Sequence, residues 1–203
     1  METITEKTIK TYDEIAKHFS DTHFDSIFWQ KEFKIFQKLI KGNKVIDIGC
    51  GAGRDAVLFE KAGFDYTGID ASSGMLKEAK KRVKKGKLIL MDFYNLKFPP
   101  ETFDGFWAAA SILHIPKHRA AKVLRNIIKI IKPNGVGFIS VKEKQSINEG
   151  IIKENKYGGI QRYFAFYTQK EFEKKLKEAG FALIRNRTLK ESNTNWLCYF
   201  VRK

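Results

Sequence analysis

Residues 45–55 read VIDIGCGAGRD, and this stretch decides the fold. Its first four residues are mostly apolar and β-branched, which is typical of a strand buried in a parallel sheet. Glycines then occupy alternate positions, at Gly49, Gly51 and Gly53. Because glycine has no Cβ, such a loop can turn with positive φ and bring bare backbone against a ligand before a helix opens at Arg54. The stretch predicts a strand, a ligand-binding loop and a helix.

The glycine spacing separates two kinds of nucleotide-binding loop. A dinucleotide loop has the pattern G-x-G-x-x-G, whereas this loop is G-x-G-x-G and has Arg54 where the last glycine would stand. The stretch from Asp47 to Gly53 instead resembles motif I of the class I methyltransferases that use S-adenosylmethionine, an acidic residue followed by G-x-G-x-G. The resemblance implies that this cofactor is bound here, by Asp47, Gly49, Cys50, Gly51, Gly53 and Arg54.

Length and composition indicate one domain, residues 1–203. Hydrophobic residues make up 43% of the chain and charged residues 30%, which is ordinary for a globular protein. No apolar run approaches the roughly 20 residues of a spanning helix, and the N-terminus METITEKTIK lacks the apolar core of a signal peptide. Cys50 and Cys198 match no metal-ligand spacing. We expect a cytoplasmic protein with two buried thiols and no metal site.

The net charge of +15 is unusual. It is compatible with nucleic acid, an anionic membrane surface or acidic substrates as partners. The lysines, however, are scattered along expected helices, as in KEAKKRVKKGK at Lys77–Lys87, which favours a solvated helix face. Charge alone therefore does not identify a partner.

Two amphipathic helices are expected before the first strand. Apolar side chains recur every three to four residues over Thr3–Phe19 and over about Ser26–Ile40. Because both segments precede the first strand, they are expected to form a lid over the ligand end of the sheet. The phrase YDEIAKHF is similar to the N-terminal helix that covers the cofactor in many small-molecule methyltransferases, which implies that Tyr12 closes over the methionine half of the cofactor. A core tyrosine on an amphipathic helix is the alternative.

The second expected strand, Phe64–Asp70, ends in an acidic residue. A carboxylate about 20 residues beyond the glycine loop accepts hydrogen bonds from both ribose hydroxyls in nucleotide folds, and Asp70 fits this place. The alternative role, an N-cap for the next helix, is already served by Ser72 and Ser73. Ala71 is assigned to the cofactor with Asp70. Met75 either packs on the adenine face or is an ordinary core residue.

The next expected strand, Lys87–Phe93, contributes a second acidic residue. The resemblance implies that Asp92 accepts a hydrogen bond from the adenine amino group and that the backbone of Phe93 reads the ring. A turn residue is the other interpretation of Asp92.

A fourth strand is expected at Thr102–Ser111, beside the first strand, where open α/β sheets bind ligands. Ala108 and Ala109 are small enough to let a methyl donor and an acceptor approach closely. A helix from about Lys117 to Ile131 and a strand at Val136–Val141 follow. The phrases FDGFWAAASILHIP and IIKPNGVGFISV resemble the corresponding region of the ubiquinone-biosynthesis-like methyltransferases.

The C-terminal quarter contains an irregular segment and then regular elements. Residues 142–159 lose periodicity and are expected to be an irregular insertion. Thr168 caps a helix that runs to Ala179, and two closing strands follow at Phe181–Thr188 and Trp196–Arg202. The predicted fold is an α/β, Rossmann-like three-layer sandwich with a mostly parallel seven-stranded sheet, an antiparallel final strand and N-terminal lid helices. Within it, residues 1–42 are the lid, 43–142 the cofactor-binding core and 143–203 the acceptor-side insertion and closing strands.

Methyl transfer needs alignment of an acceptor more than a catalytic group, because the sulfonium is already a strong leaving group. Arg54 either pairs with the carboxylate of the cofactor or bridges to Asp55. His114 follows the fourth strand and is a candidate general base, with a structural role as the alternative. Further acceptor-side candidates lie in the last third of the chain: Arg162, Tyr163, Tyr167, Asn193, Asn195 and Trp196. Arg162 would suit an anionic acceptor. For the phrase QRYFAFYT, a strand with an alternating apolar face is the alternative, at least at Phe164 and Phe166.

The resulting hypothesis is an S-adenosylmethionine-dependent methyltransferase that acts on a small molecule. The charge of +15 favours RNA or protein as the alternative acceptor. The end of strand four, AAAS, argues against it, because several macromolecule-modifying families carry Asn-Pro-Pro-Tyr there. A non-catalytic binder of the cofactor is the third hypothesis, since fold does not fix function. The acceptor and the oligomeric state are left open.

Overall fold

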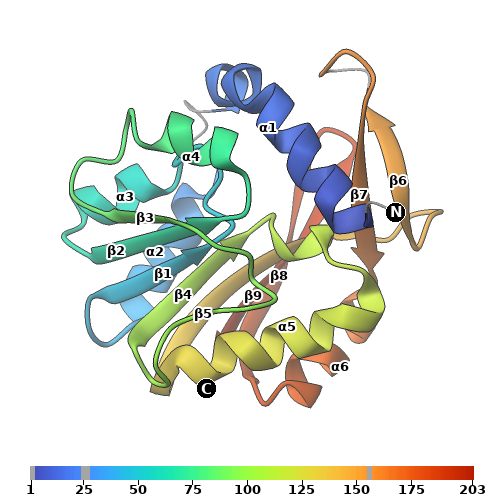
Figure 1. Cartoon of the computed structure of the whole chain (residues 1–203). Helices are drawn as coiled ribbons and strands as arrows, with labels where there is room; N and C mark the ends of the chain where they lie inside the picture. The colour runs from blue at the N-terminus through green and yellow to red at the C-terminus, as the bar shows by residue number, and fades with distance from the viewer. Residues whose placement is uncertain (1–2, 24–27, 155–156) are drawn as a thin grey trace.

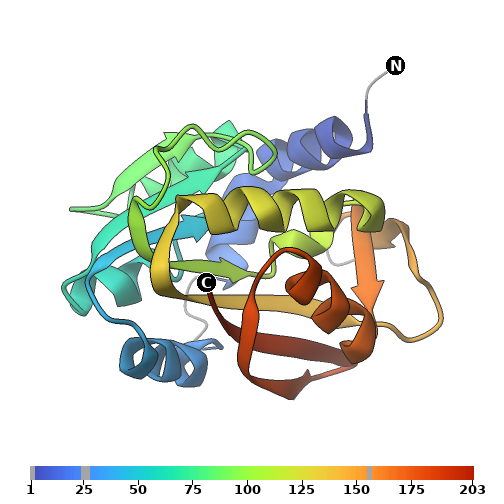
Figure 2. The same cartoon turned by 90° about the horizontal axis from the view of Figure 1, so that it is seen from below.

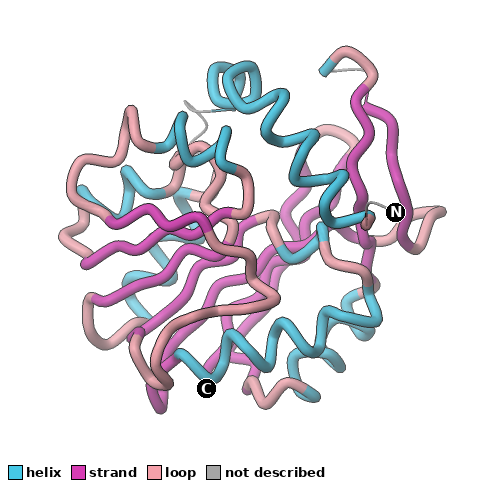
Figure 3. Tube along the Cα trace, viewed as in Figure 1, coloured by secondary structure: helices cyan, strands magenta, loops and turns pink. Residues whose placement is uncertain are grey.

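The computed structural model describes residues 3–23, 28–154 and 157–203. Within them, one sheet of nine strands is covered by helices on both faces (Figures 1 and 3). The elements in chain order are α1 (Ile4–His23), α2 (Gln30–Leu39), β1 (Lys44–Ile48), α3 (Ala56–Lys61), β2 (Asp65–Asp70), α4 (Ser73–Ala79), β3 (Lys87–Leu90), β4 (Phe103–Ala109), the short 3₁₀ helix η1 (Ile112–His114), α5 (Lys117–Ile130), β5 (Ile131–Glu143), β6 (Glu149–Glu154), β7 (Ile160–Tyr167), α6 (Gln169–Glu178), β8 (Ala182–Glu191) and β9 (Thr194–Arg202).

The sheet confirms the predicted α/β class. Strands β3, β2, β1, β4 and β5 are parallel neighbours in that order. The final strand, β9, runs antiparallel to both β5 and β8. The carboxyl ends of β1, β2, β4 and β5 therefore share one edge of the sheet, which is where ligands bind in open α/β folds.

The β6–β7 hairpin was not counted in the predicted seven-stranded sheet. Residues 142–159, expected to be irregular, include β6, which pairs antiparallel with β7. The hairpin joins the sheet over a short register, with Lys142 opposite Phe166 and Glu143 opposite Tyr167. Exposed and half-buried side chains alternate along β6, and none of them is fully buried, so its period-2 pattern is weak in the sequence. The seven predicted strands are thus present, and β6 and β7, which precede α6, bring the number to nine.

The two faces of the sheet have separate cores. On one face, α5 packs its apolar stripe against the sheet through Val123, Leu124 and Ile127 (Figure 2). On the other face, α2 and α3 contribute Phe33, Phe36 and Phe59, whose rings meet Trp107 edge-on. Burial of these large rings supplies much of the hydrophobic stabilisation of the fold.

The structure corrects the lid prediction for the second helix. The predicted start of that helix, Ser26, lies outside the described residues, and α2 begins at Gln30. Its fully buried Phe36 packs on the sheet core, so α2 is part of a covering layer. Only α1 lies across the carboxyl edge, between α4 and the β6–β7 hairpin (Figure 1). A helix that precedes the first strand can therefore still belong to the core, because its aromatic side chains are buried against a face of the sheet.

Several local predictions are confirmed. The Ser72 hydroxyl accepts a hydrogen bond from the Met75 amide and caps α4, while Thr168 and Glu171 form a capping box at the start of α6. Both cysteines are buried free thiols. Across the described part of the chain, none of the helices combines the length and the apolar character that crossing a bilayer requires.

Candidate active site

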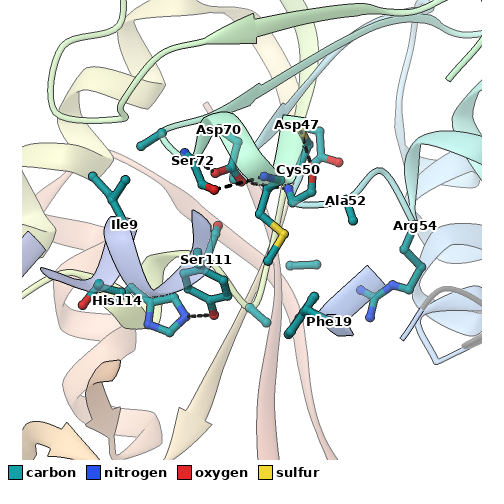
Figure 4. Close-up of a pocket in the computed structure, with 18 of the residues that line it drawn as sticks. Ile9, Phe19, Asp47, Cys50, Ala52, Arg54, Asp70, Ser72, Ser111 and His114 are labelled. Carbon is teal, nitrogen blue, oxygen red and sulfur yellow. Dashed lines mark hydrogen bonds between the residues drawn. The ribbon is translucent and has the colours of Figure 1, made fainter. Parts of the chain in front are cut away.

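A cavity of about 170 Å³ lies at the carboxyl edge of β1, β2 and β4, with α1 forming one of its walls (Figure 4). Most of the residues that sequence reasoning assigned to the cofactor line it. They are Tyr12, Asp47, Gly49, Cys50, Gly51, Arg54, Asp70, Ala71, Met75, Asp92, Phe93 and Ala109. The convergence of the glycine loop, Asp70 and Asp92 on one cavity is the arrangement that the strand order predicts.

The glycine loop closes the end of β1 against β2. The amides of Gly49 and Cys50 donate to the carbonyl of Ile69 at 2.8 and 2.9 Å. Gly49 has φ +76°, and a Cβ there would lie 2.5 Å from the Cβ of Ser111, so glycine is required. Gly51 also has positive φ, but its missing side chain faces open space in the cavity.

Two predicted cofactor residues do not line the cavity. Gly53 turns the chain behind the loop, where an added Cβ would meet Ala79 and Val83 at 3.2 Å. Ala108 is fully buried, because side chains alternate along β4 and its neighbour Ala109 faces the cavity instead.

Asp70 organises the loop from the end of β2. Its Oδ2 accepts the Gly51 amide at 2.8 Å, and its Oδ1 accepts the Ser72 amide at 2.9 Å. Burial raises the pKa of this carboxyl above its ordinary value, against the opposing effect of these two hydrogen bonds. Each oxygen keeps lone-pair capacity toward the cavity. Ser72 caps α4, which removes the N-cap alternative for Asp70.

The opposite wall carries further carboxylates. Arg54 forms a bidentate pair with Asp55, at 2.7 and 3.1 Å, so the local bridge is the alternative that the structure supports. Asp55 also accepts the indole N–H of Trp107 at 2.9 Å. Asp47 accepts the hydroxyl of Tyr66 at 2.8 Å. Burial and then the neighbouring Asp55 raise the pKa of Asp47 well above its ordinary value.

The cavity is therefore an environment for a cation. Four carboxylates, those of Asp47, Asp55, Asp70 and Asp92, line it together with the guanidinium of Arg54. The chain as a whole carries a formal charge of +15, so this concentration of acidic groups runs against the overall balance. Asp92 also accepts a hydrogen bond from the amide of Tyr94, as a turn residue would. This contact is compatible both with a turn role and with a bond from Asp92 to the adenine amino group.

A directed chain of hydrogen bonds crosses the acceptor end of the cavity. The Nδ1 of His114 lies 2.7 Å from the carbonyl oxygen of Tyr163 and must donate to it. The Nε2 of neutral His114 is then an acceptor for the hydroxyl of Tyr12, at 2.8 Å. Arg162 Nη1 donates to the same hydroxyl oxygen at 2.6 Å.

These hydrogen bonds give no support to His114 as a general base. Burial and then the charge of Arg162 lower the pKa of His114 to about 3. Burial raises the pKa of Tyr12 to about 12 despite the opposing charge of Arg162. The proton between them therefore stays on Tyr12, and both ring nitrogens of His114 are engaged.

Comparison with known proteins bears on this geometry. Residues 45–135 match the family model described as a methyltransferase domain. The matched segment begins at β1 and ends within β5, so it contains the glycine loop, Asp70 and Asp92. This segment of the chain is thus similar to methyltransferase domains. S-adenosylmethionine, the methyl donor that the class I resemblance implies, is a sulfonium that is cationic overall, which agrees with the acidic cavity.

Relatives of the methyltransferase domain differ in the acceptors that their names give. A demethylmenaquinone methyltransferase of Thermotoga maritima is 32% identical over 109 residues, covering 53% of this chain and 47% of the relative. A tRNA (carboxymethyluridine(34)-5-O)-methyltransferase of Arabidopsis thaliana is 31% identical over 134 residues, covering 65% of this chain and 31% of the relative. The chain thus spans less than half the length of either relative.

A solved structure shares the fold over nearly the whole chain. The 1,6-didemethyltoxoflavin-N1-methyltransferase of Burkholderia thailandensis, with bound 1,6-didemethyltoxoflavin and S-adenosylhomocysteine, has a TM-score of 0.77 at 19% identity. The similarity covers 96% of this chain and 87% of that one. Elements outside residues 45–135, including α1 and the closing strands, are therefore part of a fold that other proteins share.

The predicted acceptor-side residues lie outside this cavity. Four residues expected to bind substrate do not line the cavity: Arg162, Tyr163, Tyr167 and Trp196. Arg162 is held by Glu154, with Nε donating to Oε2 at 2.6 Å. The Tyr163 hydroxyl donates to Glu149, and the Tyr167 ring packs on Phe172 in the core. The alternation of β7 turns these aromatic rings into the packed layers, a result that the phrase QRYFAFYT did not reveal.

The remaining candidates lie near the β8–β9 turn. Trp196 packs edge-on against Trp29 on the α2 face of the sheet, with ring centroids 5.5 Å apart. The side-chain amide of Asn195 donates to Glu143 at 2.8 Å, and the Asn193 carbonyl accepts from Gln145 at 3.0 Å. None of these three residues is a cavity-lining residue of the methyltransferase domain.

Sequence analysis expected the helix at Thr3–Phe19 to cover the ligand end and named Tyr12 there. It did not identify the other residues of α1 that line the cavity with Tyr12. Together they form a stripe that consists of Thr5, Thr8, Ile9, Tyr12, Phe19, Ser20 and His23. Its two threonines and a serine in an otherwise apolar row were the available signal that this face meets a ligand. Ser111, next to the strained Ala110 (φ +56°), was also missed.

Proposed function

We propose that the protein is an S-adenosylmethionine-dependent methyltransferase whose acceptor is a small molecule. The observation that carries the proposal is the acidic cavity formed by the glycine loop, Asp70 and Asp92 beneath α1. Bound there, the cofactor supplies an activated methyl group on a sulfonium, and the demethylated thioether is the leaving group. The protein then has to bind, align and exclude water, which is a positional contribution to the rate.

The chain's own residues divide this work. Asp70 has lone pairs left for the ribose hydroxyls while its two backbone bonds hold the loop rigid. Asp47 offers a buried carboxylate to a cationic group. Ala109 leaves the carboxyl end of β4 open to the approaching acceptor. Tyr12 and Phe19 of α1 cover the cavity and keep water out.

Proton removal from the acceptor is not assigned to His114. Its Nε2 already accepts from Tyr12, and its pKa is lowered to about 3. An acceptor that loses its proton to solvent, or has none to lose, fits this site. A general base helps only when the acceptor must lose a proton in the transition state.

A small acceptor is favoured by the cover that α1 provides. The helix is tied on one side to α4, where Asp13 Oδ1 accepts the Gly74 amide and the Ser72 hydroxyl, both at 2.7 Å. On the other side Tyr12 joins Arg162. A large substrate would have to displace this helix. The quinone-methylating relative, and the resemblance to the ubiquinone-biosynthesis-like methyltransferases, support the same class.

RNA is the second candidate acceptor. The charge of +15 and the tRNA-methylating relative favour it. It predicts a salt-dependent complex with RNA, whereas a small-molecule enzyme has no need of one.

The test is a transfer assay with S-adenosylmethionine labelled in its methyl group. Purified protein is incubated separately with a metabolite extract, total tRNA and a protein extract, and the labelled product is identified. Label in a small molecule, absent in the Asp70→Ala variant and present in Asp65→Ala, supports the proposal; Asp65 is exposed at the start of the same strand. Label only in tRNA or protein refutes the small-molecule acceptor. Cofactor binding without any labelled product refutes enzymatic activity and favours a binder.

A further inference from the structure

A cationic, aromatic corner lies beside the cavity, and one of its cations has no anionic partner. Lys142 is at the carboxyl end of β5, opposite Trp196 of β9 in the sheet register. Its Nζ lies 4.1 Å from the centroid of the Phe164 ring and 5.8 Å from that of the Trp196 ring. Among the described residues, no carboxylate forms an ion pair with this ammonium.

The other charges of this corner balance each other. Arg162 is paired with Glu154 and is stacked among aromatic rings, including those of Tyr12 and Phe164, within about 5 Å. That pair leaves Lys142 as the excess positive charge. Burial, opposed by Glu154 and reinforced by Arg162, lowers the pKa of Lys142 below its ordinary value, which agrees with a partly buried ammonium that lacks a counter-ion.

A second donor in the same corner is also unused. The indole N–H of Trp196 is buried and has no hydrogen-bond partner among the residues that the structure describes. Leaving such a donor unpaired costs about 1–3 kcal/mol, so most buried donors in native proteins are satisfied. An ammonium and an indole N–H on paired residues, both lacking an acceptor, are what an anionic group requires.

The corner adjoins the cavity through residues that contact its lining. The Phe164 ring that Lys142 covers lies 4.9 Å from the ring of His114, which lines the cavity. Lys142 is also two residues beyond Ser140, on the same face of β5, and the Ser140 hydroxyl accepts the amide of cavity-lining Ala110 at 2.8 Å. A ligand held at Lys142 therefore reaches toward the end of β4.

We propose that Lys142, with the indole N–H of Trp196, binds a carboxylate or similar oxyanion on an aromatic methyl acceptor. The proposal rests on the proposed function and narrows its acceptor class. The ammonium supplies the charge, the indole N–H supplies a directed hydrogen bond, and the rings of Phe164 and Trp196 supply flat apolar contacts for an aromatic body. Arg162, which the sequence suggested for this anion, is already neutralised by Glu154.

The test measures binding and needs no knowledge of the natural acceptor. Protein saturated with S-adenosylhomocysteine is titrated with benzoate and, in parallel, with neutral benzamide, and the heat of binding is measured by calorimetry. Trp196→Phe removes the indole N–H and keeps an aromatic ring. Lys142→Met removes the ammonium. The matched control is Lys87→Met, which loses the same charge at the exposed edge strand β3.

We expect benzoate to saturate wild-type protein and to bind at least about tenfold more tightly than benzamide. Lys142→Met should abolish that preference, Trp196→Phe should weaken benzoate binding several-fold, and Lys87→Met should leave it unchanged. Absence of saturable benzoate binding, equal binding of benzamide, or an unaffected Lys142→Met variant with wild-type melting temperature overturns the proposal. Calorimetry with S-adenosylhomocysteine alone is run first, because failure there would refute the proposed function and would be seen separately from the benzoate result.

Discussion

The sharpest consequence of the site is that Asp70 and the ribose of the cofactor should be energetically coupled. Asp70→Ala removes an acceptor for two backbone amides, at 2.8 and 2.9 Å, and the lone pairs left for two ribose hydroxyls. Hydrogen bonds to a charged acceptor contribute about 1.5–3 kcal/mol each, and water entering the alanine cavity recovers part of that. We expect affinity for S-adenosylhomocysteine to fall by at least about 1.5 kcal/mol, or more than tenfold in Kd.

A loss of affinity in Asp70→Ala could come from the missing contact to the ribose or from a loosened glycine loop. Ligands that lack a ribose hydroxyl distinguish these two causes. The assay is calorimetric titration of wild type and Asp70→Ala with S-adenosylhomocysteine and with its 2′-deoxy and 3′-deoxy forms. Wild type should lose affinity when a hydroxyl is removed, whereas Asp70→Ala should hardly distinguish the three ligands. A hydroxyl penalty of equal size in both proteins would refute the ribose assignment, whatever the total loss. Asp65→Ala, at the exposed start of the same strand, is the control.

Three further outcomes are expected. Gly49→Ala combines φ +76° with a Cβ 2.5 Å from that of Ser111, and it should lower the free energy of unfolding in urea by about 2 kcal/mol or more. Gly51→Ala has open space at its Cβ and should lower that free energy by about 1–2 kcal/mol from backbone strain alone. Equal losses in the two variants would contradict the close approach at Gly49. Because burial raises the pKa of Asp47, the folded protein holds the proton of this carboxyl more tightly than the unfolded chain does. Stability should therefore fall as the pH rises from the ordinary pKa of Asp to the raised value. Affinity for the cationic cofactor should rise over the same pH window, because Asp47 becomes charged. Asp47→Asn should flatten both pH profiles, and unchanged profiles would show that another group titrates. Asp13→Ala removes the acceptor for the Gly74 amide and should speed cofactor dissociation in stopped-flow experiments, with an unaltered rate excluding a restraining role for this contact.

The cofactor half was predictable because its determinants are local. The loop at Gly49–Gly53 is a short contiguous pattern, and Asp70 is the last residue of an apolar strand, so parallel pairing alone brings both to one edge. The Ser72 and Thr168 caps were predictable for the same reason. Each of these predictions needed only neighbouring residues and a rule about sheets.

The acceptor half was not predictable because its side chains are arranged by tertiary contacts. Arg162 was predicted to bind an anionic acceptor, but its ion pair with Glu154 depends on the hairpin register that the sequence did not show. Lys142 was overlooked because a lysine at the end of a strand is ordinary until its lack of a partner is known. The α2 segment was misplaced since an aromatic stripe says that a helix is buried and does not say on which surface.

Tyr12 and Asp13 are adjacent on α1, yet they grip opposite sides of the domain. Tyr12 reaches His114 beside the hairpin, and Asp13 reaches the first turn of α4 beside Asp70. One helical turn thus contacts both sides of the cavity, and the residues proposed to bind the methyl donor lie underneath it. We expect compulsory-order kinetics, with the donor entering before the acceptor and the thioether leaving last, a sequence that product-inhibition patterns would reveal.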